Sequence, residues 1–256
     1  MSDIVRYAQE GAVAVITLHR PDAMNSFHTE LRAALAFALE KAHEDDSVRV
    51  VVLTGEGRTF SAGADLKAGI DRDVEEILQS EYRPVQEAIA RIPKPVIAAV
   101  PGSAAGIGLS MALQCDLMIM ADNAFLLSTF TTISLVPDGG LNWLLVRQLG
   151  YRRAFQLSVE SERIPAERCV EIGLANKAVP ADQLQEAALE WAEVLARRAP
   201  LSVAATKKVM RFAADNGWSE SYDMEAELQG DLLGSEDNKE GINAFFEKRE
   251  PNFKGK

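Results

Sequence analysis

Apolar and polar residues alternate along the first half of the chain in a way that predicts strands and helices in turn. Residues 3–20 predict two strands joined at Glu10–Gly11, because the β-branched run "AVAVITL" follows a polar glycine turn. Apolar residues then recur every three or four positions over 31–42, which is typical of an amphipathic helix. Ser26 is the expected N-cap of that helix.

The same alternation continues through the middle of the chain. The apolar run in "SVRVVVLTG" predicts a buried strand, and a longer helix is expected over about residues 73–91, ended by Pro93. "KPVIAAVPG" and "CDLMIMAD" predict two more strands, separated by the glycine-led helix "AAGIGLSMALQ". "AFLLSTF" extends this pattern, so the fold class is expected to be α/β.

The second half of the chain is expected to be mostly helical. A helix is predicted over about 139–149 after Pro137, and Gly and Pro residues separate further helices from 151 onward. We therefore divide the chain into an α/β core, residues 1–195, and a helical C-terminal region, residues 196–256.

Composition narrows the range of partners. The 256 residues are 47% hydrophobic and 25% charged, as in an ordinary globular protein. Lys and Arg total 27 against 38 Asp and Glu, and the net charge of -11 argues against nucleic acid as a partner. The N-terminal stretch "MSDIVRYAQEG" has neither the apolar core nor the basic residues of a leader, and no apolar run has membrane-spanning length, so a cytoplasmic protein without membrane attachment is expected.

The residues that most often bind metals are not arranged for it. Cys115 and Cys169 lie far apart in the sequence, which indicates neither a disulfide framework nor a metal or redox pair. His19, His28 and His43 have no metal-ligand spacing relative to one another or to the cysteines. No metal site is predicted.

The glycine-rich stretch "VLTGEGRTFSAGADL", residues 52–66, follows a predicted strand and could be a phosphate loop or a plain turn. A dinucleotide fingerprint needs a third glycine where Phe60 stands, and no Gly-Lys-Ser or Gly-Lys-Thr of a Walker loop follows. A second segment, "VIAAVPGSAAGIGLSMALQCD", also runs from strand through glycine turn to helix. Its first helical amides, near Ile107, would point outward, so two loops could converge on one oxygen atom.

Five segments in series carry a resemblance to a known family. "RPDAMNSF", "GRTFSAGADL", "KPVIAAVPGSAAGIGLSMALQCD", "LVPDGG" and "EKREPNFKGK" resemble the enoyl-CoA hydratase/isomerase (crotonase) family in order and spacing. The resemblance implies a ClpP-like spiral of ββα units with a helical C-terminal trimerisation region. It also implies an acyl-CoA substrate, of which coenzyme A is a part, with no separate cofactor, and a homotrimer or hexamer.

The resemblance also implies which backbone groups bind the thioester oxygen. Matching the motifs residue by residue assigns this role to the amides of Ala62 and Ile107. Ile107 stands where the family usually has glycine, which requires a right-handed backbone at that position.

Contacts to coenzyme A follow from the same matching. Members of the family place the adenine against the first loop, here Ala23, Ala62, Ala64, Asp65 and Leu66. Asp65 also has a local role available, accepting hydrogen bonds from turn amides. Phe245 and Lys248 are expected to reach the substrate of a neighbouring subunit, with a solvated helix end as the alternative.

The acid/base residues depart from the paired-glutamate hydratases. Ser110 and Phe130 occupy the positions that match the two glutamates, and neither can act as a carboxylate base. Asp138 in "LVPDGG" is the remaining candidate, either as the N-cap of the next helix or as a single acid/base beside an apolar wall.

Three functions remain open at this point. The preferred one is isomerisation of an enoyl or epoxyacyl thioester by proton transfer through Asp138. The second is hydration with the same single acid, and the third is a non-catalytic acyl-CoA-binding or scaffolding protein. The acyl group depends on side chains in residues 67–85 and 141–145, whose geometry the sequence does not define.

Overall fold

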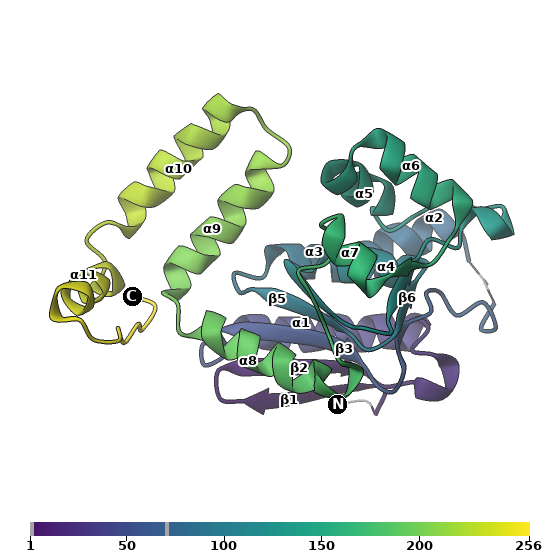
Figure 1. Ribbon diagram of the computed structural model, residues 1–256, viewed down its shortest axis with the longest axis horizontal. Helices are drawn as coiled ribbons and strands as arrows, with labels where there is room; N and C mark the ends of the chain where they lie inside the picture. The colour runs from purple at the N-terminus through teal and green to yellow at the C-terminus, as the bar shows by residue number, and fades with distance from the viewer. Residues whose placement is uncertain (1–2, 70–71) are drawn as a thin grey trace.

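Figure 1 shows the computed structural model of the protein, which describes residues 3–69 and 72–256. Its strands form one sheet in the order β1-β2-β3-β5-β7-β10 and a smaller one in the order β4-β6-β8-β9. The strands are β1 (Val5–Glu10), β2 (Val13–Leu18), β3 (Val50–Gly55), β4 (Thr59–Ser61), β5 (Val96–Val100), β6 (Ser103–Ala105), β7 (Leu117–Ala121), β8 (Phe125–Leu127), β9 (Ile164–Pro165) and β10 (Lys177–Val179).

The strand pairing confirms the predicted spiral of ββα units. β1 and β2 form the expected antiparallel hairpin, and β2, β3, β5 and β7 then run parallel, as their nearly continuous apolar sequences predict. Each later unit gives its first strand to the larger sheet and its second to the smaller one, as in β3 and β4 or β5 and β6. The glycine turns of the sequence therefore lie where the chain crosses from one sheet to the other.

Helices cover the sheets and extend beyond them. α1 packs against β1 and β2, and α8 packs against β2, β3, β5 and β7. The α-helices are α1 (Thr29–Glu44), α2 (Val74–Ile77), α3 (Arg83–Arg91), α4 (Ile107–Gln114), α5 (Leu141–Leu149), α6 (Tyr151–Glu160), α7 (Ala166–Glu171), α8 (Leu184–Ala196), α9 (Pro200–Ala213), α10 (Trp218–Leu232) and α11 (Glu236–Glu247). Short 3-10 turns are η1 (Pro21–Ala23), η3 (Thr131–Ile133) and η4 (Ala181–Gln183), and η2 (Leu78–Tyr82) is a π-helical turn.

The first helix begins later than the sequence predicts, so the expected cap at Ser26 is wrong. α1 starts at Thr29, and the capping position is taken by His28, whose side chain makes no capping hydrogen bond. The reason lies in Phe27, which forms a parallel β-bridge with Ala64 and keeps the chain extended past Ser26.

The helix expected over 73–91 is present but irregular. α2, η2 and α3 follow one another without a break from Val74 to Arg91. Pro84 lies in the first turn of α3 and has no N–H to donate to the preceding turn. The π-helical turn η2 lies immediately before it, at Leu78–Tyr82.

The C-terminal helices extend away from the sheets. Figure 1 shows α9 and α10 as an antiparallel pair, with α11 and the C-terminus at the end far from α5 and α6. α9 is tied to the core by Lys207, whose Nζ lies 2.7 Å from a carboxylate oxygen of Asp116. The predicted boundary after residue 195 falls at the last turn of α8. Among the described residues, no helix has the length and apolar character needed to cross a membrane.

Candidate active site

Two glycine loops meet just after β4 and β6, which are neighbouring strands of the smaller sheet. A methyl group added to Gly63 would lie 2.9 Å from the carbonyl oxygen of Ala105 and 3.4 Å from the nitrogen of Ile107. A methyl group on Gly106 would lie 3.7 Å from the α-carbon of Gly63. Both glycines have positive φ angles, 100° and 54°, so the backbone conformation favours glycine at both positions, and at Gly63 the close approach of Ala105 requires it as well. The predicted convergence of the two loops is therefore present.

The amides that follow these two glycines are Ala64 and Ile107. Neither N–H has a hydrogen-bond acceptor among the residues that the structure describes. The residues on either side of Ala64 are both hydrogen-bonded to Phe27. The Phe27 N–H donates to the Gly63 carbonyl at 2.7 Å, and the Phe27 carbonyl accepts from the Asp65 N–H at 3.0 Å. The N–H of Ala64 is thus held in place by its neighbours and left unpaired.

The expected donor Ala62 requires a correction. Its N–H donates to the carbonyl oxygen of Met24 at 3.0 Å, so it is not available to a thioester oxygen. Met24 lies at the end of the η1 turn, and this bond ties that turn to the first loop. Ala64, expected only as a contact to coenzyme A, has the unpaired amide instead.

The departure from glycine at Ile107 causes no strain. Ile107 is the first residue of α4, and Gly106 before it takes the positive φ. The first N–H groups of a helix have no partner within the helix and lie at the positive end of its dipole. A side chain at position 107 is therefore compatible with a backbone donor there.

Asp138 lies against the same helix. Ser110, one turn after Ile107, is fully buried and donates from Oγ to the backbone carbonyl of Asp138 at 3.0 Å. A methyl group on Gly139 would lie 2.8 Å from Cγ1 of Ile107. The loop that carries the aspartate is thus fixed against the segment that carries the second amide.

The Asp138 side chain is partly buried, and one of its carboxyl oxygens is fully buried and unpaired. Its Oδ1 has no hydrogen-bond partner within the described part of the chain. Burial raises the pKa of Asp138 to about 6. The interpretation of Asp138 as an N-cap is wrong, because α5 begins at Leu141 with Gly140 as its cap, and only the Asp138 carbonyl accepts from Leu141.

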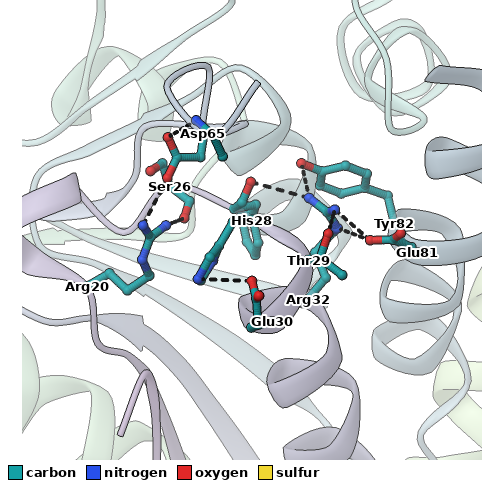
Figure 2. Close-up of polar contacts among 11 residues, drawn as sticks. Arg20, Ser26, His28, Thr29, Glu30, Arg32, Asp65, Glu81 and Tyr82 are labelled. Carbon is teal, nitrogen blue, oxygen red and sulfur yellow. Dashed lines mark hydrogen bonds and ion pairs between the residues drawn. The ribbon is translucent and has the colours of Figure 1, made fainter. Parts of the chain in front are cut away.

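Asp65 has the local role that its position allows. Its carboxylate accepts from Arg20 at 2.9 Å (Figure 2) and from the amides of Lys67 and Ala68. Burial alone would raise the pKa of Asp65, but these donors lower it below its usual value. The side chain therefore shapes the turn that follows Ala64.

The other expected contacts fall into two groups. Ala23 ends η1 next to Met24, whose carbonyl accepts from Ala62, and Leu66 is 65% exposed after the first loop. Phe130 is buried next to the second loop. The hydroxyl of the preceding residue, Thr129, would lie 3.5 Å from a methyl group placed on Gly106. Phe245 lies on α11 and Lys248 is the C-cap of that helix, at the far end of the molecule from α4 and α5 (Figure 1). A single chain does not bring these two residues to the site.

A cavity of about 430 Å³ adjoins the Asp138 loop. It is lined by Tyr82, Gln86, Gly139, Trp143 and Leu144, among others. Three of these fall within residues 67–85 and 141–145, where the acyl group was expected to be recognised. Gln86 is new, and its Nε2 is buried without a partner among the described residues. A lone glutamine on a helix carries no sequence signal that could have identified it.

Comparison with known proteins shows the family of this chain. The sequence model described as Enoyl-CoA hydratase/isomerase matches residues 8–256. A probable enoyl-CoA hydratase of Rhodobacter capsulatus is 40% identical, with 98% of each chain covered. A 1,2-epoxyphenylacetyl-CoA isomerase of Escherichia coli is 36% identical over the full length of both chains. The crystal structure of an enoyl-CoA hydratase from Bacillus anthracis superimposes with a TM-score of 0.95 at 34% identity, covering 99% of this chain and 100% of that one. The chain therefore belongs to the enoyl-CoA hydratase/isomerase family.

Proposed function

We propose that the protein is an enzyme that acts on acyl-CoA thioesters by stabilising an enolate, with Asp138 as its single acid/base. The observation that carries this proposal is the meeting of the Gly63 and Gly106 loops, each followed by an unpaired amide, beside a carboxyl group that has one buried, unpaired oxygen. The similar hydratase and isomerase, each named for a CoA thioester, support this substrate class.

The two backbone amides and Asp138 have different roles in the proposed reaction. Removing a proton next to a thioester carbonyl moves negative charge onto the carbonyl oxygen. Two fixed amides, Ala64 and Ile107, would each stabilise that charge by about 3 to 4 kcal/mol relative to an empty position. Asp138 takes the proton from C2 of a 3-enoyl thioester. It returns the proton to C4 as the double bond moves to C2–C3.

We prefer isomerisation to hydration. Hydration by the paired-carboxylate route needs two acidic side chains at the positions that Ser110 and Phe130 occupy. Neither of these residues can act as a carboxylate base. The Ser110 hydroxyl also donates to the Asp138 carbonyl, so its proton is already engaged. Hydration by Asp138 alone is the second candidate, because relatives named as hydratases and as isomerases are both similar to this chain.

A small substrate panel separates the two reactions. The enzyme is incubated with a 3-enoyl-CoA, a 2-enoyl-CoA and an aromatic epoxyacyl-CoA, and products are identified by mass and ultraviolet absorbance. Isomerisation leaves the mass unchanged while the spectrum changes, whereas hydration adds the mass of one water. If no substrate is converted but each binds, the protein is a non-catalytic acyl-CoA-binding member of the family.

The pH profile of activity is a further prediction. Asp138 must be ionised to accept a proton, and its pKa is raised by burial to about 6. We expect kcat/KM to reach a plateau above that pH and to fall about tenfold per unit below it. A profile that remains flat down to pH 4.5 would exclude Asp138 as the base.

We also propose that the protein forms a trimer or hexamer through its C-terminal helices. Trp218, Phe245 and Phe246 are 81%, 78% and 76% exposed in the single chain, which is unusual for large apolar side chains. Such an assembly could bring Phe245 and Lys248 to the site of a neighbouring subunit.

Light scattering tests the assembly. We expect the mass of three or six chains for the wild-type protein. Trp218→Glu should give a smaller species with an unchanged circular dichroism spectrum. A monomeric wild-type protein would contradict the proposal.

A further inference from the structure

A buried arginine lies between the two halves of the site. Arg32, on α1, is 6% exposed and uses three nitrogens to contact four groups (Figure 2). Nη1 donates to the carbonyl of Phe27 at 3.3 Å and to the hydroxyl of Tyr82 at 3.1 Å. Nη2 donates to Thr29 Oγ1 at 2.9 Å, and both Nε and Nη2 donate to one carboxylate oxygen of Glu81. Only the planar fork of arginine can make such a set at once.

Through Phe27, the hydrogen bonds of Arg32 connect to the loop that carries the Ala64 amide. The Phe27 carbonyl that accepts from Arg32 also accepts from the Asp65 N–H at 3.0 Å. The N–H of Phe27 donates to Gly63. The Phe27 peptide unit therefore holds the backbone on both sides of Ala64, and Arg32 holds Phe27.

Through Tyr82, the hydrogen bonds of Arg32 connect to the surroundings of Asp138, the proposed acid/base. Tyr82 lines the same cavity as Gly139, the residue that follows Asp138. Burial raises the pKa of Tyr82, the positive charge of Arg32 opposes that rise, and the negative charge of Asp138 adds to it. The Tyr82 hydroxyl accepts from Arg32, which leaves its own proton for another acceptor. The guanidinium carbon also lies 4.5 Å from the centre of the Tyr82 ring.

The local backbone supports a functional role. Glu81 and Tyr82 are consecutive residues, and both contact Arg32 from within the π-helical turn η2. Single π-helical turns inside longer helices occur frequently at functional sites. Arg72 forms a second ion pair with Glu81, so two arginines meet at the same carboxylate.

We propose that Arg32 is a positioning residue that couples the two halves of the site: through Phe27 it fixes the Ala64 amide, and through Tyr82 and Glu81 it fixes the helix facing Asp138. This inference rests on the proposed function, because it assumes that the Ala64 amide binds the thioester oxygen. Arg32 itself makes no contact with the substrate in this account.

Arg32→Lys is the most direct test, because it keeps the charge beside Glu81 and removes the fork. We expect kcat to fall about 10- to 100-fold from misplacement of the donor, with a smaller change in KM. The second readout is the absorbance of para-dimethylaminocinnamoyl-CoA, whose band moves to longer wavelength when donors polarise its thioester carbonyl. That red shift should shrink in the variant.

A second buried ion pair provides the matched control. Lys207 is bonded to Asp116 and to the carbonyls of Ile89 and Lys94, on the side of α9 that faces the core. Lys207→Arg should leave kcat and the red shift at wild-type values. Equal losses in the Lys207 and Arg32 variants would show a general loss of packing and overturn the inference.

The outcomes separate this inference from the proposed function. Wild-type kcat and red shift in Arg32→Lys would overturn the positioning role alone. Absence of a red shift in the wild-type protein would instead remove the proposed oxyanion site. If Arg32→Lys does not fold, Tyr82→Phe carries the test, since it deletes only the hydroxyl that accepts from Arg32. We expect a lower kcat there as well, and an unchanged kcat would overturn the inference.

Discussion

Replacing Asp138 by asparagine is expected to lower kcat by about 10² to 10⁴, the usual contribution of a general acid/base. The dissociation constant of a saturated acyl-CoA should remain at its wild-type value, because the two amides and the cavity are unchanged. Steady-state kinetics and calorimetric titration measure the two quantities. Wild-type turnover in this variant would eliminate Asp138 from the mechanism.

The same substitution has a predicted effect on stability, which also serves as the control for folding. The pKa of Asp138 is raised in the folded protein, so the stability contributed by its neutral form is fully present below pH 3.8 and is lost as the pH rises through about 6. Asparagine does not ionise. We therefore expect Asp138→Asn to unfold with a free energy higher by about 1 kcal/mol at pH 8, a figure reduced because part of the side chain meets solvent. The two proteins should be equal at pH 3.

Removing the second backbone donor should have an effect of similar size. Proline at position 107 deletes the N–H, and proline is well tolerated at the first position of a helix. Ile107 occupies that position in α4. We expect Ile107→Pro to lower kcat by about 10²- to 10³-fold, as loss of one oxyanion donor does in other enzymes.

Ile107→Val is the matched control for the side chain. Ile107 is 3% exposed and packs against Gly139, so any replacement also disturbs the loop that carries Asp138. Valine keeps the amide and most of the volume, and its kcat should stay within a factor of a few of wild type. If valine and proline reduce kcat equally, the loss comes from packing and the donor role of Ile107 is refuted.

The alternating architecture could be predicted from the sequence because the signals are local. The buried strands β3, β5 and β7 are short apolar runs, bounded by glycine or proline at β3 and β5 and by aspartate at β7, and the amphipathic period of α1 is regular. The beginning of α1 could not be predicted, because it depends on the bridge between Phe27 and Ala64, which are distant in the sequence. Propensity at Ser26 was overridden by a tertiary contact.

The sequence predicted which segments form the site, but it predicted less well which atoms are available for chemistry. Motif matching brought the loops around Gly63 and Gly106 together, yet it placed the first donor at Ala62. Which amide remains unpaired depends on where Met24 and Phe27 make their bonds, and no sequence pattern records that. The Asp138 carboxyl likewise makes no capping hydrogen bond, because α5 begins only at Leu141 and has Gly140 as its N-cap.

Exchange of the α-proton of a bound saturated acyl-CoA with deuterium from solvent tests the central claim most directly, because it needs both enolate stabilisation and a base but no double bond. We predict deuterium incorporation at C2 with the wild-type enzyme, none with Asp138→Asn, and strongly slowed incorporation with Ile107→Pro, all followed by mass spectrometry. Binding of the thioester without any exchange in the wild-type protein, or exchange that persists unchanged in Asp138→Asn, would contradict the account.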